Sequence, residues 1–384
     1  MNRENTRKLQ GVEPLWSTYI HAKASRLGIP LSGNFELTAR CNFNCKMCYI
    51  HDGQPSREGE LTAEEWLSIA KTARDSGMVF LLLTGGEPLI RKDFREIYQG
   101  LKKLGLLISI NTNASLITED YVEFFRKDPP LRLNISLYGG CGDTYRALCG
   151  VDSFETVTRH IRALHDAGIQ IRLNASLTPL NRTDVPAIYA FGEELGIPVK
   201  GTAYMFPPTR IEGKPYENGS IRFTPEEAAA CTLECREQFL TAEELAAGVK
   251  DLPHDPAEDC ADGQGEKMRC RAGKTAFWIT WDGRMLPCGM FPYEGVRLAD
   301  TSFDQAWEAT KASVAAVTLP KECTDCPLRD QCPACAASCL AESGDTAVCP
   351  SYVCTMTKAL ARMTAEKYAK KTEKYAEKAE KYAP

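Results

Sequence analysis

Short apolar runs alternate with amphipathic stretches from about residue 34 to residue 206. The runs have the length and apolar content of buried β-strands, and the stretches between them have the patterning of helices. Strands that alternate with helices in this way are typical of a parallel sheet with right-handed crossovers. The predicted strands are residues 34–38, 79–83, 107–111, 131–137, 169–177 and 199–206.

Capping signals indicate where the intervening helices begin. Thr62 and Glu65 frame a capping-box sequence, and Thr118 precedes an acidic first turn. Residues 152–155 give a further helix start, as does Asp184 just ahead of a proline. The six βα units in series predict an α/β fold, a partial (βα)6 TIM-type barrel, in which chemistry lies at the C-terminal ends of the strands.

The pattern changes after residue 206, where Pro and Gly become frequent. A capped helix begins at Thr224, and the density of cysteines rises from Cys260 to Cys354. In the tail, small and aromatic residues recur at helical spacing over too few heptads for a coiled coil, which favours an exposed helix. The chain is therefore divided into a helical extension (1–33), the barrel (34–206), a linker or helical region (207–255), a cysteine-rich domain (256–355) and a charged helix (356–384).

Composition narrows the classes of function. The 384 residues are 43% apolar, and a net charge of −5 without a long Lys/Arg block argues against nucleic acid as the main partner. Residues 1–30 lack the apolar region of a secretory signal, and no later stretch reaches the ~18 uncharged apolar residues of a membrane span. A cytoplasmic location is expected. In that reducing compartment the 17 cysteines indicate metal ligation rather than disulfides.

Three cysteines lie just after the first predicted strand. Cys41, Cys45 and Cys48 are spaced so that their thiolates can bind three corners of an iron–sulfur cubane. A complete [4Fe–4S] site normally uses four cysteines, so one iron would stay open to a small molecule. A zinc site is the alternative, with His51 as the nearby candidate for a fourth ligand.

This motif resembles the CxxxCxΦC signature of the radical S-adenosylmethionine (SAM) superfamily, with Met47 at the Φ position. The resemblance implies an anaerobic enzyme in which SAM binds the open iron and is reductively cleaved to methionine and a 5′-deoxyadenosyl radical. It also implies that Met47 and Tyr49 contact the cofactor, and that a reductant such as flavodoxin or ferredoxin supplies the electron. The protein would then supply placement and exclusion of water.

A second motif follows the second predicted strand, where Gly85, Gly86 and Glu87 precede a proline. Glycines there allow the backbone to approach a ligand closely, and a carboxylate can accept from an ammonium group. The sequence is similar to the GGEP motif of the same superfamily. That similarity implies that Gly85, Gly86 and Glu87 hold the amino group of SAM.

Polar residues near the ends of the third and fourth predicted strands are further candidates. Asn113 and Ser136 occupy places where superfamily members hold the ribose or carboxylate of SAM, and Arg146 is expected to pair with that carboxylate. The ordinary alternative is that such Asn and Ser side chains satisfy the loop backbone. No catalytic acid or base is identified; the polar groups expected near the cavity are Tyr138, Tyr204, Arg210 and Asp282.

The C-terminal region holds a second constellation of cysteines. Close CxxC turns joined through distant cysteines are typical of a loop-rich domain tied to metal, and zinc ribbons compete for any two of these pairs. The spacing of Cys270, Gly283 and Cys288 resembles the start of the SPASM domain, which follows many radical SAM barrels and binds auxiliary clusters. By that resemblance, the first auxiliary [4Fe–4S] cluster takes Cys270, Cys288 and either Cys335 or Cys339, with Cys260 a candidate fourth ligand. The second takes Cys323, Cys326, Cys332 and Cys354, with Cys349 as the alternative to Cys354.

Four cysteines lie outside both patterns and are expected to be small buried apolar groups: Cys141, Cys149, Cys231 and Cys235.

Radical SAM enzymes of the SPASM type characteristically act on peptides or proteins, so the resemblance implies maturation of a ribosomally synthesised peptide. One alternative is protein oxidation like that of anaerobic sulfatase maturases, whose Asp after the second auxiliary cysteine is replaced by Gly289. Another is a small-molecule or cofactor-pathway oxidoreductase, which would share every motif. A non-enzymatic electron carrier would leave the GGEP motif unexplained. Residues 1–33 are too few for a winged-helix leader-binding domain of about eighty residues, so either a separate leader-recognition protein or direct binding of the leader is expected.

Overall fold

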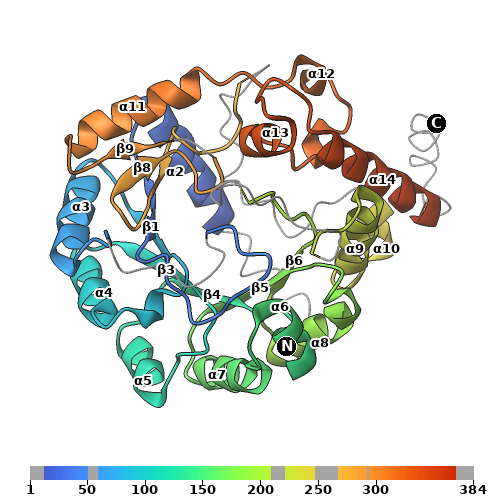
Figure 1. The fold of residues 1–384 in the computed structure, drawn as a ribbon, viewed down its shortest axis with the longest axis horizontal. Coiled ribbons are helices and arrows are strands. Elements are labelled where there is room, and N and C mark those ends of the chain that lie inside the picture. The colour runs from blue at the N-terminus through green and yellow to red at the C-terminus, as the bar shows by residue number, and fades with distance from the viewer. Residues whose placement is uncertain (1–12, 51–58, 209–220, 247–266, 292–293, 369–384) are drawn as a thin grey trace.

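A computed structural model describes residues 13–50, 59–208, 221–246, 267–291 and 294–368 of the chain. Within these ranges one nine-stranded sheet curves into an open barrel, with helices on its outer side (Figure 1). The strand order is β6-β5-β4-β3-β2-β1-β7-β8-β9. The strands are β1 (Ser32–Glu36), β2 (Phe80–Thr84), β3 (Leu107–Thr112), β4 (Arg132–Ser136), β5 (Ile171–Ser176), β6 (Val199–Thr202), β7 (Ala276–Ile279), β8 (Arg284–Leu286) and β9 (Val296–Arg297).

Strands β1 to β6 pair in parallel and in chain order, which confirms the predicted partial barrel of six βα units. The register aligns Phe35, Leu83, Ile110 and Leu133 across four neighbouring strands, and all four side chains are fully buried. Because side chains alternate along a strand, this row fills the layer between sheet and outer helices. β6 ends at Thr202, earlier than the predicted strand end.

The sheet extends beyond the predicted barrel into the cysteine-rich region. β7 pairs in parallel with the outer edge of β1, aligning Ala276 with Ser32, and β8 and β9 continue from it as antiparallel strands. This pairing covers the edge of β1, which would otherwise present unpaired backbone groups. The cysteine-rich region therefore shares one sheet with the barrel, and the domain limits inferred from the sequence remain a prediction.

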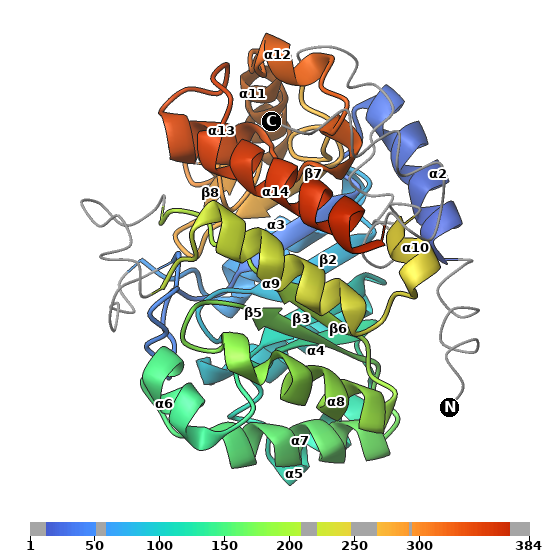
Figure 2. The same cartoon turned by 90° about the vertical axis from the view of Figure 1, so that its right-hand side faces the viewer.

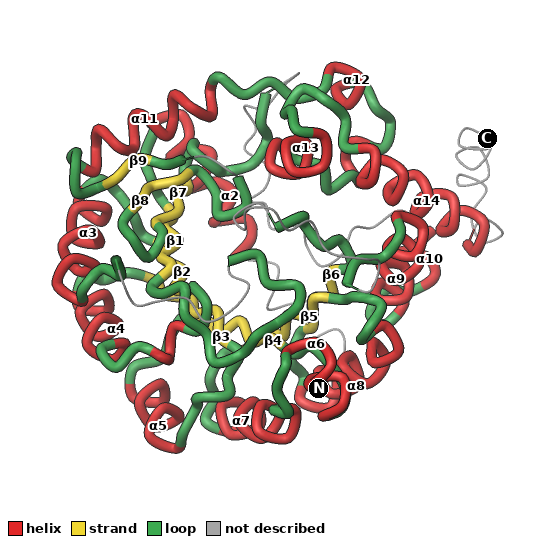
Figure 3. The backbone as a smooth tube through the Cα atoms, viewed as in Figure 1, coloured by secondary structure: helices red, strands yellow, loops and turns green. Residues whose placement is uncertain are grey.

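Helices α3 to α8 follow the first strands in turn and form the outer layer, as the separation of helices from strands in Figure 3 makes clear. The α-helices are α2 (Glu13–Leu27), α3 (Ala63–Asp75), α4 (Phe94–Lys103), α5 (Glu119–Lys127), α6 (Gly142–Cys149), α7 (Phe154–Asp166), α8 (Val185–Leu195), α9 (Pro225–Glu237), α10 (Ala242–Ala246), α11 (Phe303–Ala315), α12 (Lys321–Thr324), α13 (Ala336–Ser343) and α14 (Ser351–Tyr368). Short 3-10 turns occur at η1 (Pro88–Ile90), η2 (Arg182–Asp184) and η4 (Arg329–Gln331).

The predicted helix starts are largely confirmed. Thr62 and Thr224 head complete capping boxes, and the Thr118 side chain accepts a hydrogen bond in the first turn of α5. The start near residue 152 is right in position: Ser153 is the N-cap residue of α7, although its side chain makes no capping hydrogen bond. The Asp184 side chain does not cap α8; it accepts from the amide N–H of a loop glycine instead.

The C-terminal helix α14 lies along α9 rather than standing alone (Figure 2). Its apolar side chains, including Val353 and Met356, are buried in the core, and Lys367 and Tyr368 both contact Glu237 of α9 at 2.6 and 2.7 Å. The expectation of an exposed tail helix is thus wrong up to Tyr368, and residues 369–384 lie outside the described ranges. Among the described helices, none combines the length and the apolar character needed to cross a membrane.

Candidate active site

The cysteine segment and the GGEP turn lie together at the C-terminal edge of the barrel. Leu37 donates to the Thr84 carbonyl at 2.9 Å, Gly86 to the Thr38 carbonyl at 2.8 Å, and Glu87 to the Arg40 carbonyl at 2.9 Å. These three backbone hydrogen bonds continue the pairing of β1 with β2 past the ends of both strands.

The two glycines of the turn are required by this backbone contact. A Cβ on Gly85 would lie 2.3 Å from the Thr38 carbonyl oxygen, and one on Gly86 would lie 2.2 Å from that of Arg40. Gly85 also has a φ of +141°, a region that other residues rarely adopt. The sequence predicted that the backbone at these glycines comes close to another group. In the structure that group is the backbone at the start of the cysteine segment.

The cysteine segment supplies sulfur ligands with hydrogen-bond donors around them. Cys41 is 8% exposed, and its Sγ accepts from the Phe43 amide at 3.4 Å and from the Asn113 Nδ2 at 3.8 Å. Burial raises the pKa of Cys41 to about 12, and the nearby thiols of Cys45 and Cys48 add to this rise. The three thiols lie close enough to affect each other, a donor set that fits an iron–sulfur cluster.

A fourth thiol contacts this segment. Cys149, at the end of α6, is fully buried and its thiol interacts with that of Cys45, raising the pKa of Cys45 together with burial. Two backbone hydrogen bonds hold α6 here, from Asn44 to the Cys149 carbonyl at 3.0 Å and from Lys46 to the Leu148 carbonyl at 2.9 Å. Burial of Cys149 was expected, but its place beside Cys45 gave no signal in the sequence because the two lie far apart along the chain.

Glu87 is fully buried, and its carboxylate is bonded to its own surroundings. It accepts from the Asn113 amide at 2.7 Å, the Thr112 hydroxyl at 2.8 Å and the Leu89 amide at 3.1 Å. Burial raises the pKa of Glu87 to about 7, although these hydrogen bonds oppose the rise. The carboxylate thus holds the end of β3 beside the cysteine segment, and its contact with SAM remains a prediction.

The other predicted SAM contacts fall into different environments. Asn113 is brought to the cysteine segment, where its Nδ2 also donates to Asn42 at 3.0 Å. Ser136 lies at the end of β4 and bonds the buried hydroxyl of Tyr138, whose pKa burial raises strongly. Arg146 is half exposed on α6 and is paired with Asp143 at 2.8 Å and Asp152 at 2.7 Å. Its pairing with SAM would require those contacts to be exchanged. Among the remaining candidates, Met47 is buried in the core and Tyr49 is half-buried. The Tyr204 hydroxyl donates to Glu342, and Asp282 is paired with Arg284. Arg210 lies outside the described residues.

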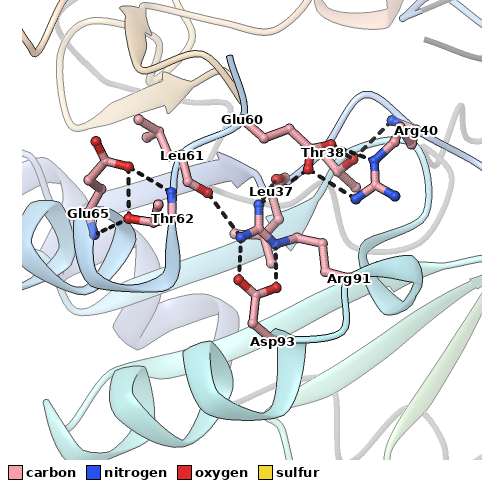
Figure 4. A network of polar contacts seen from close by, with 9 residues as sticks. All are labelled: Leu37, Thr38, Arg40, Glu60, Leu61, Thr62, Glu65, Arg91 and Asp93. Atoms are coloured by element: carbon pink, nitrogen blue, oxygen red, sulfur yellow. Dashed lines mark hydrogen bonds and ion pairs between the residues drawn. The ribbon is translucent and has the colours of Figure 1, made fainter. Parts of the chain in front are cut away.

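An ion-pair network at the base of the cysteine segment was not predicted (Figure 4). Glu60 is bonded to Arg40 and Thr38, while Arg91 bridges Glu60 and Asp93. Burial opposes ionisation of Glu60, but hydrogen bonds from Arg40 and Thr38 outweigh it and keep its pKa below the usual value. In the sequence these residues have no feature that distinguishes them from surface polar residues. The network could not be predicted because its members come from separate segments that only the fold brings together.

The C-terminal cysteines separate into two neighbourhoods. Cys270 and Cys288 pack against a small apolar cluster that includes Ala336, which directly follows Cys335. Cys335 is the N-cap of α13, and Cys339 is buried one turn later. In the second neighbourhood Cys349 contacts the thiols of Cys323 and Cys354, and Cys326 and Cys332 lie near them. Cys260 lies outside the described residues.

No three Cys, His, Asp or Glu side chains in the described ranges are already arranged as ligands of one metal ion. Amide and hydroxyl donors nevertheless point at cysteine sulfurs, from Met290 to Cys288 and from Thr357 to Cys332, both at 3.4 Å. Such contacts are typical of cluster-binding thiolates. Outside both neighbourhoods, Cys231 and Cys235 are buried as expected, whereas Cys141 is exposed, so that expectation is wrong for Cys141.

Two curated relatives illustrate the similarity in sequence. A probable GTP 3′,8-cyclase of Saccharolobus solfataricus is 35% identical over 175 residues, which are 45% of this chain and 56% of that protein. The chain thus spans little more than half the length of that relative. An AdoMet-dependent heme synthase of Methanosarcina barkeri is 24% identical over 325 residues, 81% of this chain and 92% of that protein.

Solved structures with the same fold include two with bound SAM. Streptococcus suis SuiB bound to S-adenosylmethionine has a TM-score of 0.63 at 18% identity, covering 85% of this chain and 77% of SuiB. Native anSMEcpe with bound AdoMet has a TM-score of 0.68 at 17% identity, covering 89% of this chain and 99% of that one. The model of the Radical SAM superfamily matches residues 35–191, the part that holds the cysteine segment and the GGEP turn. The chain therefore carries a radical SAM domain of this superfamily at residues 35–191.

Proposed function

We propose that Cys41, Cys45 and Cys48 bind a [4Fe–4S] cluster with SAM at its open iron, and that the chain abstracts a hydrogen atom from a peptide during its maturation. The observation that carries this proposal is the junction of cysteine segment and GGEP turn at the C-terminal edge of a parallel barrel. This edge is where barrel enzymes place their chemistry.

When bound, the cluster and SAM supply one-electron cleavage and a 5′-deoxyadenosyl radical, which is the hydrogen-abstracting species. The chain's own residues hold the ligands in place. Phe43 and Asn113 donate to Cys41 Sγ, and hydrogen bonds of this kind tune the potential of a thiolate-bound cluster. Glu87 fixes the main chain at Asn113, and the half-buried Tyr138 beside Cys45 helps to exclude water.

We assign the auxiliary ligands from their neighbourhoods. Cys270 and Cys288 pack against the small apolar cluster that includes Ala336. Cys335 directly precedes Ala336 as the N-cap of α13, and this favours Cys335 over Cys339 for the first auxiliary cluster. Cys323, Cys326, Cys332 and Cys354 are the ligands proposed for the second. Cys349 contacts two of these thiols and stays the alternative to Cys354.

The peptide substrate is supported by two solved neighbours. SuiB is known with its precursor peptide SuiA, at a TM-score of 0.64, and anSMEcpe with the Cp18Cys peptide, at 0.65. A reductant such as flavodoxin or ferredoxin, and a separate leader-recognition protein, complete this proposal. The sulfatase-maturase alternative loses support, because a Cβ on Gly289 would lie 2.8 Å from the Trp278 ring and leaves little room for an Asp.

A small-molecule substrate is the second candidate, favoured by the names of the cyclase and heme synthase relatives. The two are separated by deuterium transfer into 5′-deoxyadenosine. Reduced, reconstituted protein would be incubated with SAM and either deuterated short peptides encoded near its gene, GTP or a porphyrin. Label from a peptide supports the maturase, label from GTP or the porphyrin supports the second candidate, and SAM cleavage without label from any of them leaves both substrate classes unsupported.

A further inference from the structure

Arg40 and Glu60 stand at the two ends of the segment that carries Cys41, Cys45 and Cys48. The Arg40 guanidinium binds the Glu60 carboxylate with two hydrogen bonds, Nε to Oε1 at 2.9 Å and Nη2 to Oε2 at 3.0 Å. The Arg40 and Glu60 side chains are only 19% and 5% exposed. A bidentate pair shielded from water in this way is held more firmly than a surface ion pair.

The pair is anchored to the barrel by its neighbours, as Figure 4 shows. Glu60 also accepts from the Thr38 hydroxyl, and Arg91 approaches its Oε2 at 3.8 Å. Arg91, 4% exposed, donates to the Leu37 carbonyl at 2.8 Å and to that of Leu61 at 3.0 Å. The Glu60 carboxylate and its partner Arg91 therefore connect three segments: the chain just after β1, the chain at Leu61 and the end of the η1 turn.

The charges in this network balance, because Asp93 pairs with Arg91 at 2.7 Å while Glu60 pairs with Arg40. Removing one member leaves a buried charge without compensation, which is the costly way to disrupt such a site. The carbonyl of Arg40 also accepts from Glu87, so movement of Arg40 would disturb the cysteine segment and the GGEP turn together.

We propose that Arg40, Glu60 and Arg91 form a clasp that closes the base of the cysteine segment and holds it against the GGEP turn, with Glu60 as the central positioning residue. The proposal rests on the function proposed above, since it takes these cysteines as cluster ligands. Loop closure by the clasp keeps the three thiols together when iron leaves, and so slows loss of the catalytic cluster.

The test compares wild type with Glu60→Gln, which keeps the shape of the side chain and removes its charge. As-isolated full-length protein is treated with an iron chelator and an alkylating reagent, and alkylation is followed by mass spectrometry at each cysteine. In Glu60→Gln we expect Cys41, Cys45 and Cys48 to be alkylated about 10–100 times faster, which is the factor by which loss of an outer-shell contact weakens metal binding. Cys323 and Cys326 serve as internal references and should not change.

Glu123→Gln is the matched control, because it breaks an equally bidentate but exposed pair with Arg126. If Glu60→Gln accelerates all cysteines alike, or none, the clasp proposal is overturned. Should Glu60→Gln fail to fold, Arg40→Lys retains the charge and loses the bidentate geometry, and the same acceleration at the three cysteines is expected. A wild type without iron at these cysteines would defeat the proposed function, whereas a wild type with iron and an unaffected variant would defeat only the clasp.

Discussion

Replacing Arg222 by Met tests how the barrel is joined to the C-terminal region. Arg222 binds Glu342 of α13 and stacks 3.7 Å from the ring centroid of Tyr352 on α14, while Glu342 also accepts from the Tyr204 hydroxyl at 2.7 Å. The side chains of Arg222 and Glu342 are 19% and 8% exposed, so their charges are largely removed from water.

The expected loss follows from these contacts. In Arg222→Met the Glu342 carboxylate keeps its hydrogen bond from the Tyr204 hydroxyl but loses its positively charged partner. Leaving a carboxylate this buried without its partner lowers the free energy of unfolding by about 3 kcal/mol. An unfolding entropy of roughly 2.1 cal/mol/K per residue over the 384 residues converts this to a Tm lower by about 4 °C. The double variant Arg222→Met/Glu342→Met removes the stranded charge and should recover at least half of the loss.

The assay is anaerobic thermal unfolding of cluster-loaded protein at one scan rate. Arg126→Met, which breaks an exposed pair with Glu123, is the matched control and should leave Tm unchanged. The reasoning is refuted if Arg222→Met lowers Tm no more than this control, or if the double variant is as unstable as the sum of its two single changes.

Three further predictions concern the candidate site. The pKa of Glu87 is raised from 4.5 to about 7, so the contribution of Glu87 to stability is fully present below about pH 4.5 and is lost as the pH rises through 7. Relative to Glu87→Gln, wild type should therefore lose about 3 kcal/mol of stability between pH 4.5 and 8. Thermal unfolding that shows wild type gaining stability over this range would contradict the prediction. Gly86→Ala should abolish iron binding at the catalytic cluster, because its Cβ would meet the Arg40 carbonyl, whereas Gly105→Ala, with open space around it, should retain full iron. Cys149→Ala should keep the iron content of wild type and lose about 1 kcal/mol of stability; a fall of iron would instead identify Cys149 as a ligand.

Much of the fold could be predicted because local signals agreed with the global arrangement. The alternation of apolar runs with capped helices gave the six βα units, and Thr62 and Thr224 marked helix starts correctly. The parallel pairing of β7 with β1 could not be predicted, since it joins residues more than two hundred positions apart and has no local pattern.

The candidate site divides in the same way. Spacing alone identifies Cys41, Cys45, Cys48 and the GGEP turn, because the chemistry needs those residue types close together in sequence. The roles of Glu60 and Arg91 depend on burial and on partners from other segments, so the sequence shows them as ordinary charged residues. Arg146 illustrates the reverse, since it looked suited to an anion but is paired with two carboxylates of its own neighbourhood.

The most direct test of the central claim is iron and 5′-deoxyadenosine measured on the same preparation. Wild type and the triple variant Cys41→Ala/Cys45→Ala/Cys48→Ala would be reconstituted anaerobically, reduced with dithionite and given SAM. The account predicts well above four irons and SAM cleavage for wild type, with loss of about four irons and of all cleavage in the variant. A wild type that holds full iron yet makes no 5′-deoxyadenosine, or a variant that still makes it, would contradict the account.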